Sequence, residues 1–245
     1  MPQFRSFTPT HAAAVVCVTA VIACLVIVAR AWRDTRRQRV LEWAIAGAIV
    51  ALRAGVFVWN LMPSRISLAT ALPLQICDLT ALCSAAALVT HRRFVAAIAY
   101  FWGLSLSIQG LLQPDLAGGP HSLSFWLFWL HHALIVGAAV YLVAVRHFHP
   151  TRRDLVISVG AGLVYVAVVF VVDMLLGVNY GYLGKGLPSQ PTLLSWLGPW
   201  PWRVAVMAAL GAAAMSLLWV PWAARSRSRG ISVRDMPRGA DRVAL

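Results

Sequence analysis

Seven long apolar stretches divide this chain, and they constrain its fold more than any other feature. Each is long enough to cross a bilayer, which takes about 20 residues of α-helix. The expected spans are residues 12–31, 41–61, 70–90, 94–112, 122–145, 155–177 and 202–222. The sequence therefore predicts an all-α, polytopic integral membrane helix bundle with seven transmembrane helices.

The composition supports the same class. Hydrophobic residues make up 60% of the chain and charged residues only 12%, far from the balance of a soluble protein. The connections are short, and 245 residues in seven helices leave no room for a second folded domain. We expect one transmembrane domain, residues 1–223, followed by a basic, disordered cytoplasmic tail, residues 224–245.

The basic residues indicate how the chain is oriented. A net charge of +13 would suggest nucleic acid in a soluble protein, but the arginines here are sorted by loop. They cluster after the first, third and fifth spans and in the tail, while the opposite gaps hold few. The positive-inside rule then places the N-terminus outside and the C-terminus in the cytoplasm. We expect a multi-pass protein of the cell membrane that contacts membrane lipids and no nucleic acid, with its oligomeric state left open.

The first span and the cysteines exclude two other interpretations. The basic cluster follows the first span instead of preceding it, so we interpret this span as a retained helix and not a signal peptide. The cysteines Cys17, Cys24, Cys77 and Cys83 all lie inside expected spans, and none forms a CxxC pair. They therefore supply neither a disulfide framework nor a zinc ribbon.

Polar residues within or beside the spans gather in one half of the membrane. Such a group is costly at bilayer depth and normally faces the bundle interior. Under the predicted topology they lie in the outer half, and the inner half is nearly bare of them. We expect one cavity, open toward the outer leaflet, with Arg53 within ion-pair reach of an aspartate. Its expected lining is Gln75 or Asp78, Gln109, His131 or His132, and Asp173.

Helical spacing places several of these residues on common faces. Trp102, Ser105, Gln109 and Gln113 follow one another at i, i+3, i+7 and i+11, and Ser158, Gly162, Tyr165 and Asp173 share a face in the same way. Both stripes should face inward. Because adjacent residues point about 100° apart on a helix, we expect only one of His131 and His132 to enter the cavity.

These residue types leave several chemistries open. No GxSxG, HExxH, Walker or dinucleotide-binding glycine pattern occurs, which removes the common soluble chemistries. A Cys–His nucleophile–base pair is compatible with the depths of Cys77 and either His131 or His132. A zinc-dependent membrane hydrolase would use His and Asp ligands, but no i, i+4 histidine pair is present, and we predict no metal site. A transporter, receptor or assembly subunit that binds a small ligand in the same cavity is the non-enzymatic alternative. Arg53 with Asp78 or Asp173 would then be a structural ion pair.

Several segments, taken in order, resemble a known family. They are LPLQICDL at 72–79, YFWGLSLSIQGLLQPDL at 100–116, FWLHHALI at 128–135, and NYGYL at 179–183 with LGPWPW at 197–202. Together they resemble the YwaF-like integral membrane family, which includes the animal transmembrane-protein-164 phospholipid acyltransferases. The resemblance runs from the second span to the seventh. One departure is Gln75, where members of the family often have histidine.

The resemblance implies a lipid acyltransferase or acyl hydrolase that acts on glycerophospholipids without a cofactor. In this mechanism the base, best matched by His132, takes the proton of Cys77, and the thiolate attacks a phospholipid ester. Gln109 would donate to the oxyanion, and Asp78 or Asp173 would orient the histidine. The predicted catalytic residues are Cys77 with His132 or His131. The predicted substrate-binding residues are Arg53, Gln75, Asp78, Gln109, Asp115, His121, Asp173, Asn179 and Tyr180, with Arg53 or His121 meeting the phosphate.

Overall fold

The computed structural model describes residues 4–32, 35–64, 66–116, 118–188 and 192–228. Within these residues every element is helical. The spans are α1 (Pro9–Ala31), α2 (Arg36–Asn60), α3 (Leu68–Ala71) with α4 (Ile76–Thr90), α5 (Arg93–Trp102) with η1 (Gly103–Ser107) and α6 (Gln109–Leu112), α7 (Leu123–Ala144), α8 (Arg152–Leu176) and α9 (Trp202–Ser228). Two short 3₁₀ turns, η2 (Tyr180–Tyr182) and η3 (Leu193–Trp196), lie between α8 and α9. Seven helical segments are long and apolar enough to cross a membrane, which confirms the predicted fold class.

Three of the spans begin earlier than hydropathy predicts, because threonines cap them. The side chains of Thr8, Thr35 and Thr151 accept hydrogen bonds from backbone N–H groups in the first turns of α1, α2 and α8. Each cap starts the helix several residues before the apolar run. The first turn therefore belongs to the helix, but a hydropathy window does not detect it because its residues are polar.

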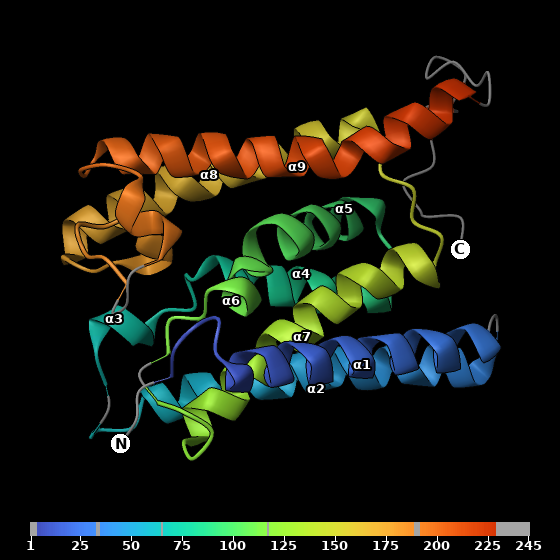
Figure 1. Cartoon of the computed structure of the whole chain (residues 1–245), viewed down its shortest axis with the longest axis horizontal. Helices are drawn as coiled ribbons and strands as arrows, with labels where there is room; N and C mark the ends of the chain where they lie inside the picture. The colour runs from blue at the N-terminus through green and yellow to red at the C-terminus, as the bar shows by residue number, and fades with distance from the viewer. Residues whose placement is uncertain (1–3, 33–34, 65, 117, 189–191, 229–245) are drawn as a thin grey trace.

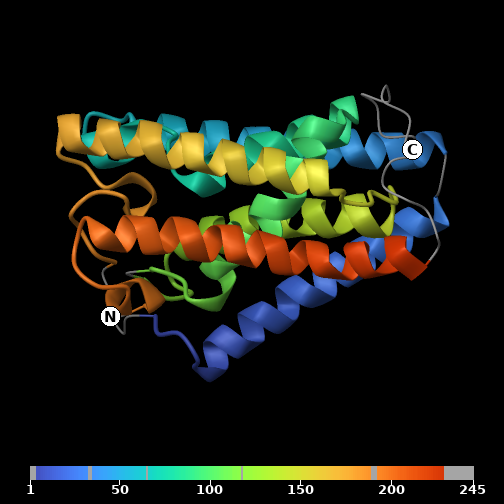
Figure 2. The same cartoon turned by 90° about the horizontal axis from the view of Figure 1, so that it is seen from above.

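The helices form layers around a central group (Figure 1). α8 and α9 lie on one side, α1 and α2 on the other, and α4, α5 and α7 lie between them. Figure 2 shows α1 crossing the bundle obliquely. We call the end that carries α3 and the α8–α9 connection the α3 end, and the end with the α1–α2 and α7–α8 connections the C-terminal end.

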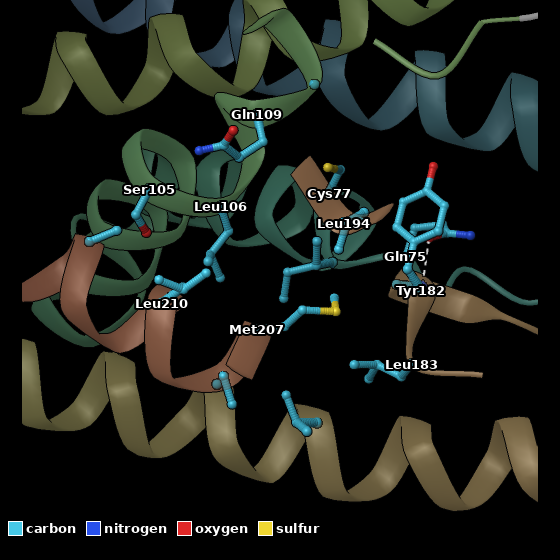
Figure 3. Close-up of a pocket in the computed structure, with 18 of the residues that line it drawn as sticks. Gln75, Cys77, Ser105, Leu106, Gln109, Tyr182, Leu183, Leu194, Met207 and Leu210 are labelled. Carbon is cyan, nitrogen blue, oxygen red and sulfur yellow. Dashed lines mark hydrogen bonds between the residues drawn. The ribbon is translucent and has the colours of Figure 1, made fainter. Parts of the chain in front are cut away.

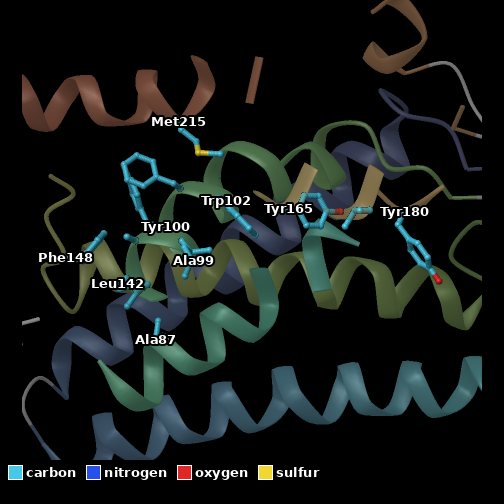
Figure 4. Packing of buried hydrophobic residues seen from close by; sticks show 14 of the residues in the cluster. Ala87, Ala99, Tyr100, Trp102, Leu142, Phe148, Tyr165, Tyr180 and Met215 are labelled. Atoms are coloured by element: carbon cyan, nitrogen blue, oxygen red, sulfur yellow. The ribbon is translucent and has the colours of Figure 1, made fainter. Parts of the chain in front are cut away.

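The middle layer is buried by the outer two. Ala97, Ala99 and Phe101 of α5 are fully buried, and small side chains there let neighbouring helices approach closely (Figure 4). The outer helices instead expose large apolar side chains, such as Leu175 of α8 at 79% and Leu217 of α9 at 71%. An apolar surface of this extent is stable only against lipid, so the chain is a multi-pass membrane protein.

The third span is broken where Pro73 stands. The backbone is extended at Leu72 and at Gln75, and the chain becomes helical again at Ile76. Pro73 lacks an amide donor and disfavours helix in the residue before it, which explains the break. As a result Cys77 and Asp78 lie in the first turn of α4, at the α3 end of the bundle.

The C-terminal end contains a buried charge cluster that the sequence did not predict. Glu42 of α2 has no exposed surface, accepts a hydrogen bond from the Tyr141 hydroxyl at 2.8 Å, and is bound by both Nε and an Nη of Arg146. His91 Nε2 lies 3.2 Å from the same carboxylate. The expectation of a nearly bare half of the bundle is therefore wrong. From the sequence alone, Arg146 counts only among the basic loop residues that indicate orientation. Its guanidinium instead turns inward and neutralises the buried Glu42 carboxylate.

The start of the tail also differs from prediction. α9 continues to Ser228, so residues 224–228 are helical and not part of a disordered tail. The rest of the predicted tail lies outside the described residues.

Candidate functional site

A cavity of about 540 Å³ opens at the α3 end of the bundle. α4, the η1–α6 segment, α7, α8, α9 and the loop after α8 all contribute to its wall, and we call it the main cavity. In Figure 3, Cys77 and Gln109 lie on the opposite side of the cavity from Met207 and Leu183. The polar lining comprises Gln75, Cys77, Asp78, Ser105, Gln109, Gln113, Asp115, His131, His132, Tyr165, Tyr182 and Thr192.

The main cavity has one polar and one apolar part. α4, α6 and α7 supply the thiol, amide, carboxylate and imidazole groups, whereas α8 and α9 supply almost only apolar side chains and glycines. The apolar wall consists of Val159, Gly162, Leu163, Val166, Met207, Ala208, Leu210, Gly211, Ala212, Ala214 and Met215. This wall reaches from Met207 to Met215 along α9, about 12 Å at the rise of an α-helix. The shape suits an amphipathic ligand with its apolar part between α8 and α9.

Cys77 lies where a helix begins. It is in the first turn of α4, whose unpaired backbone N–H groups give this end of the helix a partial positive charge. The Ser107 hydroxyl lies beside the thiol. Thiolates are favoured at helix N-termini, so the local backbone is suited to a nucleophilic sulfur.

His132 is fixed with one ring nitrogen available. Its Nδ1 lies 2.9 Å from the Phe128 carbonyl oxygen, which can only accept, so Nδ1 carries the proton and Nε2 has the free lone pair. The Phe128 ring packs on the imidazole with 4.2 Å between centroids. Nε2 lies against Gly110 of α6, where any Cβ would overlap the ring.

Arg53, Asp78 and His131 join three helices beside the cavity. An Nη of Arg53 lies 2.7 Å from Asp78 Oδ1, and His131 Nε2 lies 3.9 Å from the same oxygen. Both histidines line the main cavity, contrary to the expectation that only one would enter it. The reason is that the cavity surrounds this face of α7, and the two rings lie edge to face with 5.2 Å between centroids.

The loop after α8 is held over the cavity by side chains that line it. Gln75 Oε1 accepts a hydrogen bond from the Gly181 N–H at 2.9 Å, and Gln113 Oε1 accepts one from the Leu193 N–H at 2.9 Å. The Tyr182 hydroxyl donates to Asp115 at 2.9 Å. Burial, and after it the Asp115 charge, raises the pKa of Tyr182, which keeps the phenol protonated for this bond.

Five predicted site residues lie outside the main cavity lining: Arg53, described above, and four others. Asp173 is fully buried and accepts a hydrogen bond from the Tyr180 N–H at 2.9 Å, and the Tyr180 hydroxyl binds Leu68 and Leu72 of the broken third span. Asn179 packs against Gly184 and Gly186 in the same loop. These residues support the loop, because the chain turns back over the end of α8. The fourth, His121, is exposed in the turn before α7.

Sequence reasoning missed several residues that shape the site. Ser107, Gly110 and Phe128 carry no charge and match no motif. The spacing of Phe128 and His132, i and i+4 on one helix, was the one available signal for their contact. Among the described residues, no group of three or more His, Cys, Asp or Glu side chains is arranged to hold a metal ion.

The fold and site together define a class. This is a seven-span membrane protein with a half-buried thiol, two histidines and a carboxylate around an amphipathic cavity. The family model described as TMEM164 family matches residues 6–219, and the chain belongs to that family. Comparison with curated proteins and with solved structures gave no match.

Proposed function

We infer that the protein transfers an acyl chain from a glycerophospholipid through a thioester on Cys77, with His132 as the base. The observation that carries this proposal is that Cys77, at the start of α4, and the unprotonated Nε2 side of His132 belong to one cavity with an apolar wall. The apolar part would hold the acyl chain between α8 and α9. The polar part would hold the glycerol ester near the thiol.

The first half-reaction makes an acyl-enzyme. His132 Nε2 takes the thiol proton, and the thiolate of Cys77 attacks the ester carbonyl carbon. Gln109 lines the same cavity and is suited to donate from its amide to the oxyanion. The C–O bond of the ester then breaks, His132 returns its proton to the departing lysolipid oxygen, and the acyl chain remains on sulfur as a thioester.

The second half-reaction releases the chain. An acceptor hydroxyl gives its proton to His132 and attacks the thioester carbonyl, and the C–S bond breaks as the thiol is reprotonated. With a lysophospholipid as acceptor the reaction is acyl transfer, and with water it is hydrolysis. Asp78, which lies near His131 and is paired with Arg53, is placed to position the α7 histidines.

The experiment compares variants of the purified chain, using phospholipids with a labelled acyl chain. Cys77→Ala and His132→Ala should each abolish turnover, and the double variant should be little worse, because nucleophile and base act as a unit. Cys83→Ala is the matched control: it is on the same helix, does not line the main cavity, and should keep wild-type turnover. A labelled acyl group that is stable in acid but released by hydroxylamine should appear on the wild type and not on Cys77→Ala.

His131→Ala tests the choice between the adjacent histidines. Its effect should be much smaller than that of His132→Ala, because only His132 has its Nδ1 proton held by a backbone carbonyl. Turnover retained in Cys77→Ala would exclude covalent catalysis at this residue. It would favour a cavity that binds a ligand without reacting with it.

A further inference from the structure

A second cavity, of about 520 Å³, lies on the other side of α7 from the apolar wall of the main cavity. We call it the side cavity. It is formed by the last turns of α2, the first turns of α7 and the loop before α7. Its lining residues are Arg53, Val56, Trp59, Asn60, Leu116, Leu123, Ser124, Leu127, Phe128 and His131.

Two residues separate the cavities. Phe128 and His131, on one face of α7, line both of them. Only 8% of the His131 surface is exposed, and its Nε2 has no hydrogen-bond partner within the described part of the chain. A buried imidazole nitrogen without a partner is costly, and a ligand atom in either cavity would satisfy it.

Arg53 brings a positive charge to the side cavity. Asp78 is its hydrogen-bonding partner among the described residues, and the contact is made through one Nη at 2.7 Å. A guanidinium carries five N–H donors in a fixed fork, so most of its donors are left for another acceptor. Arg53 lines the side cavity and not the main one, whereas Asp78 lines only the main one. The ion pair therefore crosses the partition between the cavities, with its cationic member on the side-cavity face.

Of the other polar groups there, Asn60 suits an oxyanion. Asn60 lines the same cavity, and its amide donates one N–H to the Thr70 carbonyl at 3.4 Å, which leaves the second N–H for a ligand. The Ser124 hydroxyl donates to Ser122 Oγ at 3.2 Å, so a ligand meets its oxygen and not its proton. Phosphate oxygens accept charge-assisted hydrogen bonds from a guanidinium, often two at once. The rest of the lining is aliphatic or aromatic, including Val56, Leu123 and Leu127, which suits the chain of a lipid better than a hydrated ion.

We propose that the side cavity is a second lipid site, in which Arg53 binds the phosphate of a lysophospholipid while Val56, Leu123 and Leu127 contact its acyl chain. Binding here does not require the thioester chemistry at Cys77. If that chemistry operates, this lipid is placed as the acyl acceptor, on the far side of His131 from the donor chain.

Calorimetric titration of the full chain in a phosphate-free maltoside detergent tests the proposal. The probes are a 1-acylglycerol 3-phosphate, the monoacylglycerol with the same chain, and inorganic phosphate. The phosphate lipid should bind the wild type at least tenfold more tightly than the monoacylglycerol. Arg53→Gln should weaken the phosphate lipid by roughly ten- to hundredfold, the usual range for a charge-assisted bond, and leave the monoacylglycerol unchanged.

Asp78→Asn is the variant that separates a binding arginine from a structural ion pair. It removes the charge that partly neutralises Arg53 but keeps the guanidinium, so it should bind the phosphate lipid at least as tightly as the wild type. Weaker binding in both Arg53→Gln and Asp78→Asn would overturn the proposal in favour of a structural pair. Arg53→Lys, which keeps the charge next to Asp78, replaces Arg53→Gln if the latter does not fold.

Two bulky substitutions locate the bound lipid. Val56→Trp fills only the side cavity and should abolish binding of the phosphate lipid, whereas Leu210→Trp fills only the main cavity and should not change it. The reverse result would overturn the proposal. Equal affinity for inorganic phosphate would support the phosphate site and overturn its assignment to a lipid.

Binding and turnover measurements test the second lipid site and the acyl-transfer proposal separately. Cys77→Ala should bind the phosphate lipid like the wild type. Normal binding with no turnover in the wild type would refute the acyl-transfer proposal alone. Turnover without binding in the side cavity would refute the second lipid site alone.

Discussion

Replacing Gly110 with alanine should destabilise the protein through one side chain, His132. A Cβ at Gly110 would overlap Nε2 and its neighbouring ring atoms. The imidazole has little room to move, because Phe128 covers one face at 4.2 Å between centroids and Nδ1 is bonded to the Phe128 carbonyl. Forced overpacking of this kind costs about 1–3 kcal/mol. At about 2–4 °C per kcal/mol for a chain of this length, the melting temperature should fall by about 2–12 °C.

Gly160→Ala is the matched control. Gly160 is helical, in α8, and a Cβ there would meet nothing within 4 Å. The same substitution should therefore leave the stability unchanged or raise it by up to about 1 kcal/mol, through helix propensity. Both variants are measured by thermal unfolding in one detergent, followed by circular dichroism.

A double-mutant cycle assigns the penalty to the clash. Adding His132→Ala to Gly110→Ala removes the ring that the new Cβ meets, so the two changes together should destabilise by about 1–3 kcal/mol less than the sum of the singles. Strict additivity, or an unchanged melting temperature in Gly110→Ala, would refute the claim that Gly110 is required by its contact with His132. The proposed mechanism adds that Gly110→Ala lowers turnover, because the Cβ occupies the space beside the basic nitrogen.

Three further predictions concern other parts of the molecule. Glu42→Gln should destabilise the protein by about 3–5 kcal/mol, since it leaves Arg146 without its buried counter-charge. Tyr141→Phe removes one hydrogen bond to the carboxylate and should cost less, about 1.5–3 kcal/mol; thermal unfolding compares the two variants, and a larger effect of Tyr141→Phe would contradict the assignment. Burial, and after it the Arg146 charge, lowers the pKa of His91 below its usual 6.5, although Glu42 acts in the opposite direction. Below about pH 6.5 the unfolded state therefore binds more protons than the folded state, and the free energy of unfolding should fall as the pH drops. A pH series of melting temperatures should show a shallower fall in His91→Gln, and an unchanged slope would count against this residue. Finally, a membrane-impermeant thiol reagent should label Leu187→Cys in intact cells but Arg37→Cys only after permeabilisation, and the opposite pattern would reverse the predicted orientation.

The number and order of the spans were predictable because hydropathy determines which segments can cross a membrane, although it does not determine where each helix starts or breaks. Ser158, Tyr165 and Asp173 of α8 are buried as their spacing predicts, since α8 is a regular helix along its whole length. The residues of the Trp102 stripe also turn inward, although the π-turn η1 lies between Trp102 and Gln109 and interrupts the α-helical spacing used to predict their common face. Trp102 donates to the Ser158 carbonyl at 3.0 Å, and Ser105, Gln109 and Gln113 line the main cavity.

Contacts between helices were not predictable in the same way. Glu42 finds its partners in His91 and Arg146, which lie in connections that the charge count treated only as indicators of orientation. The role of Asp173 depends on a loop that folds back over α8, and no periodicity describes that loop. The partition between the two cavities requires the positions of α2, α4 and α7 relative to one another.

The π-helical turn η1 (Gly103–Ser107) determines which side of α6 faces the main cavity. A π-turn holds one residue more than the α-helix around it, so it offsets everything that follows by about 100°. If the residues of η1 were wound as a regular α-helix, Gln109 and Gly110 would rotate by about 100° away from Cys77 and His132. Deleting one residue within Gly103–Ser107 would instead let the turn close as an α-helix and leave Gln109 and Gly110 facing the cavity, because the π-turn holds its extra residue within itself. The polar wall of the main cavity therefore depends on a π-turn that accommodates one extra residue in the middle of a membrane helix.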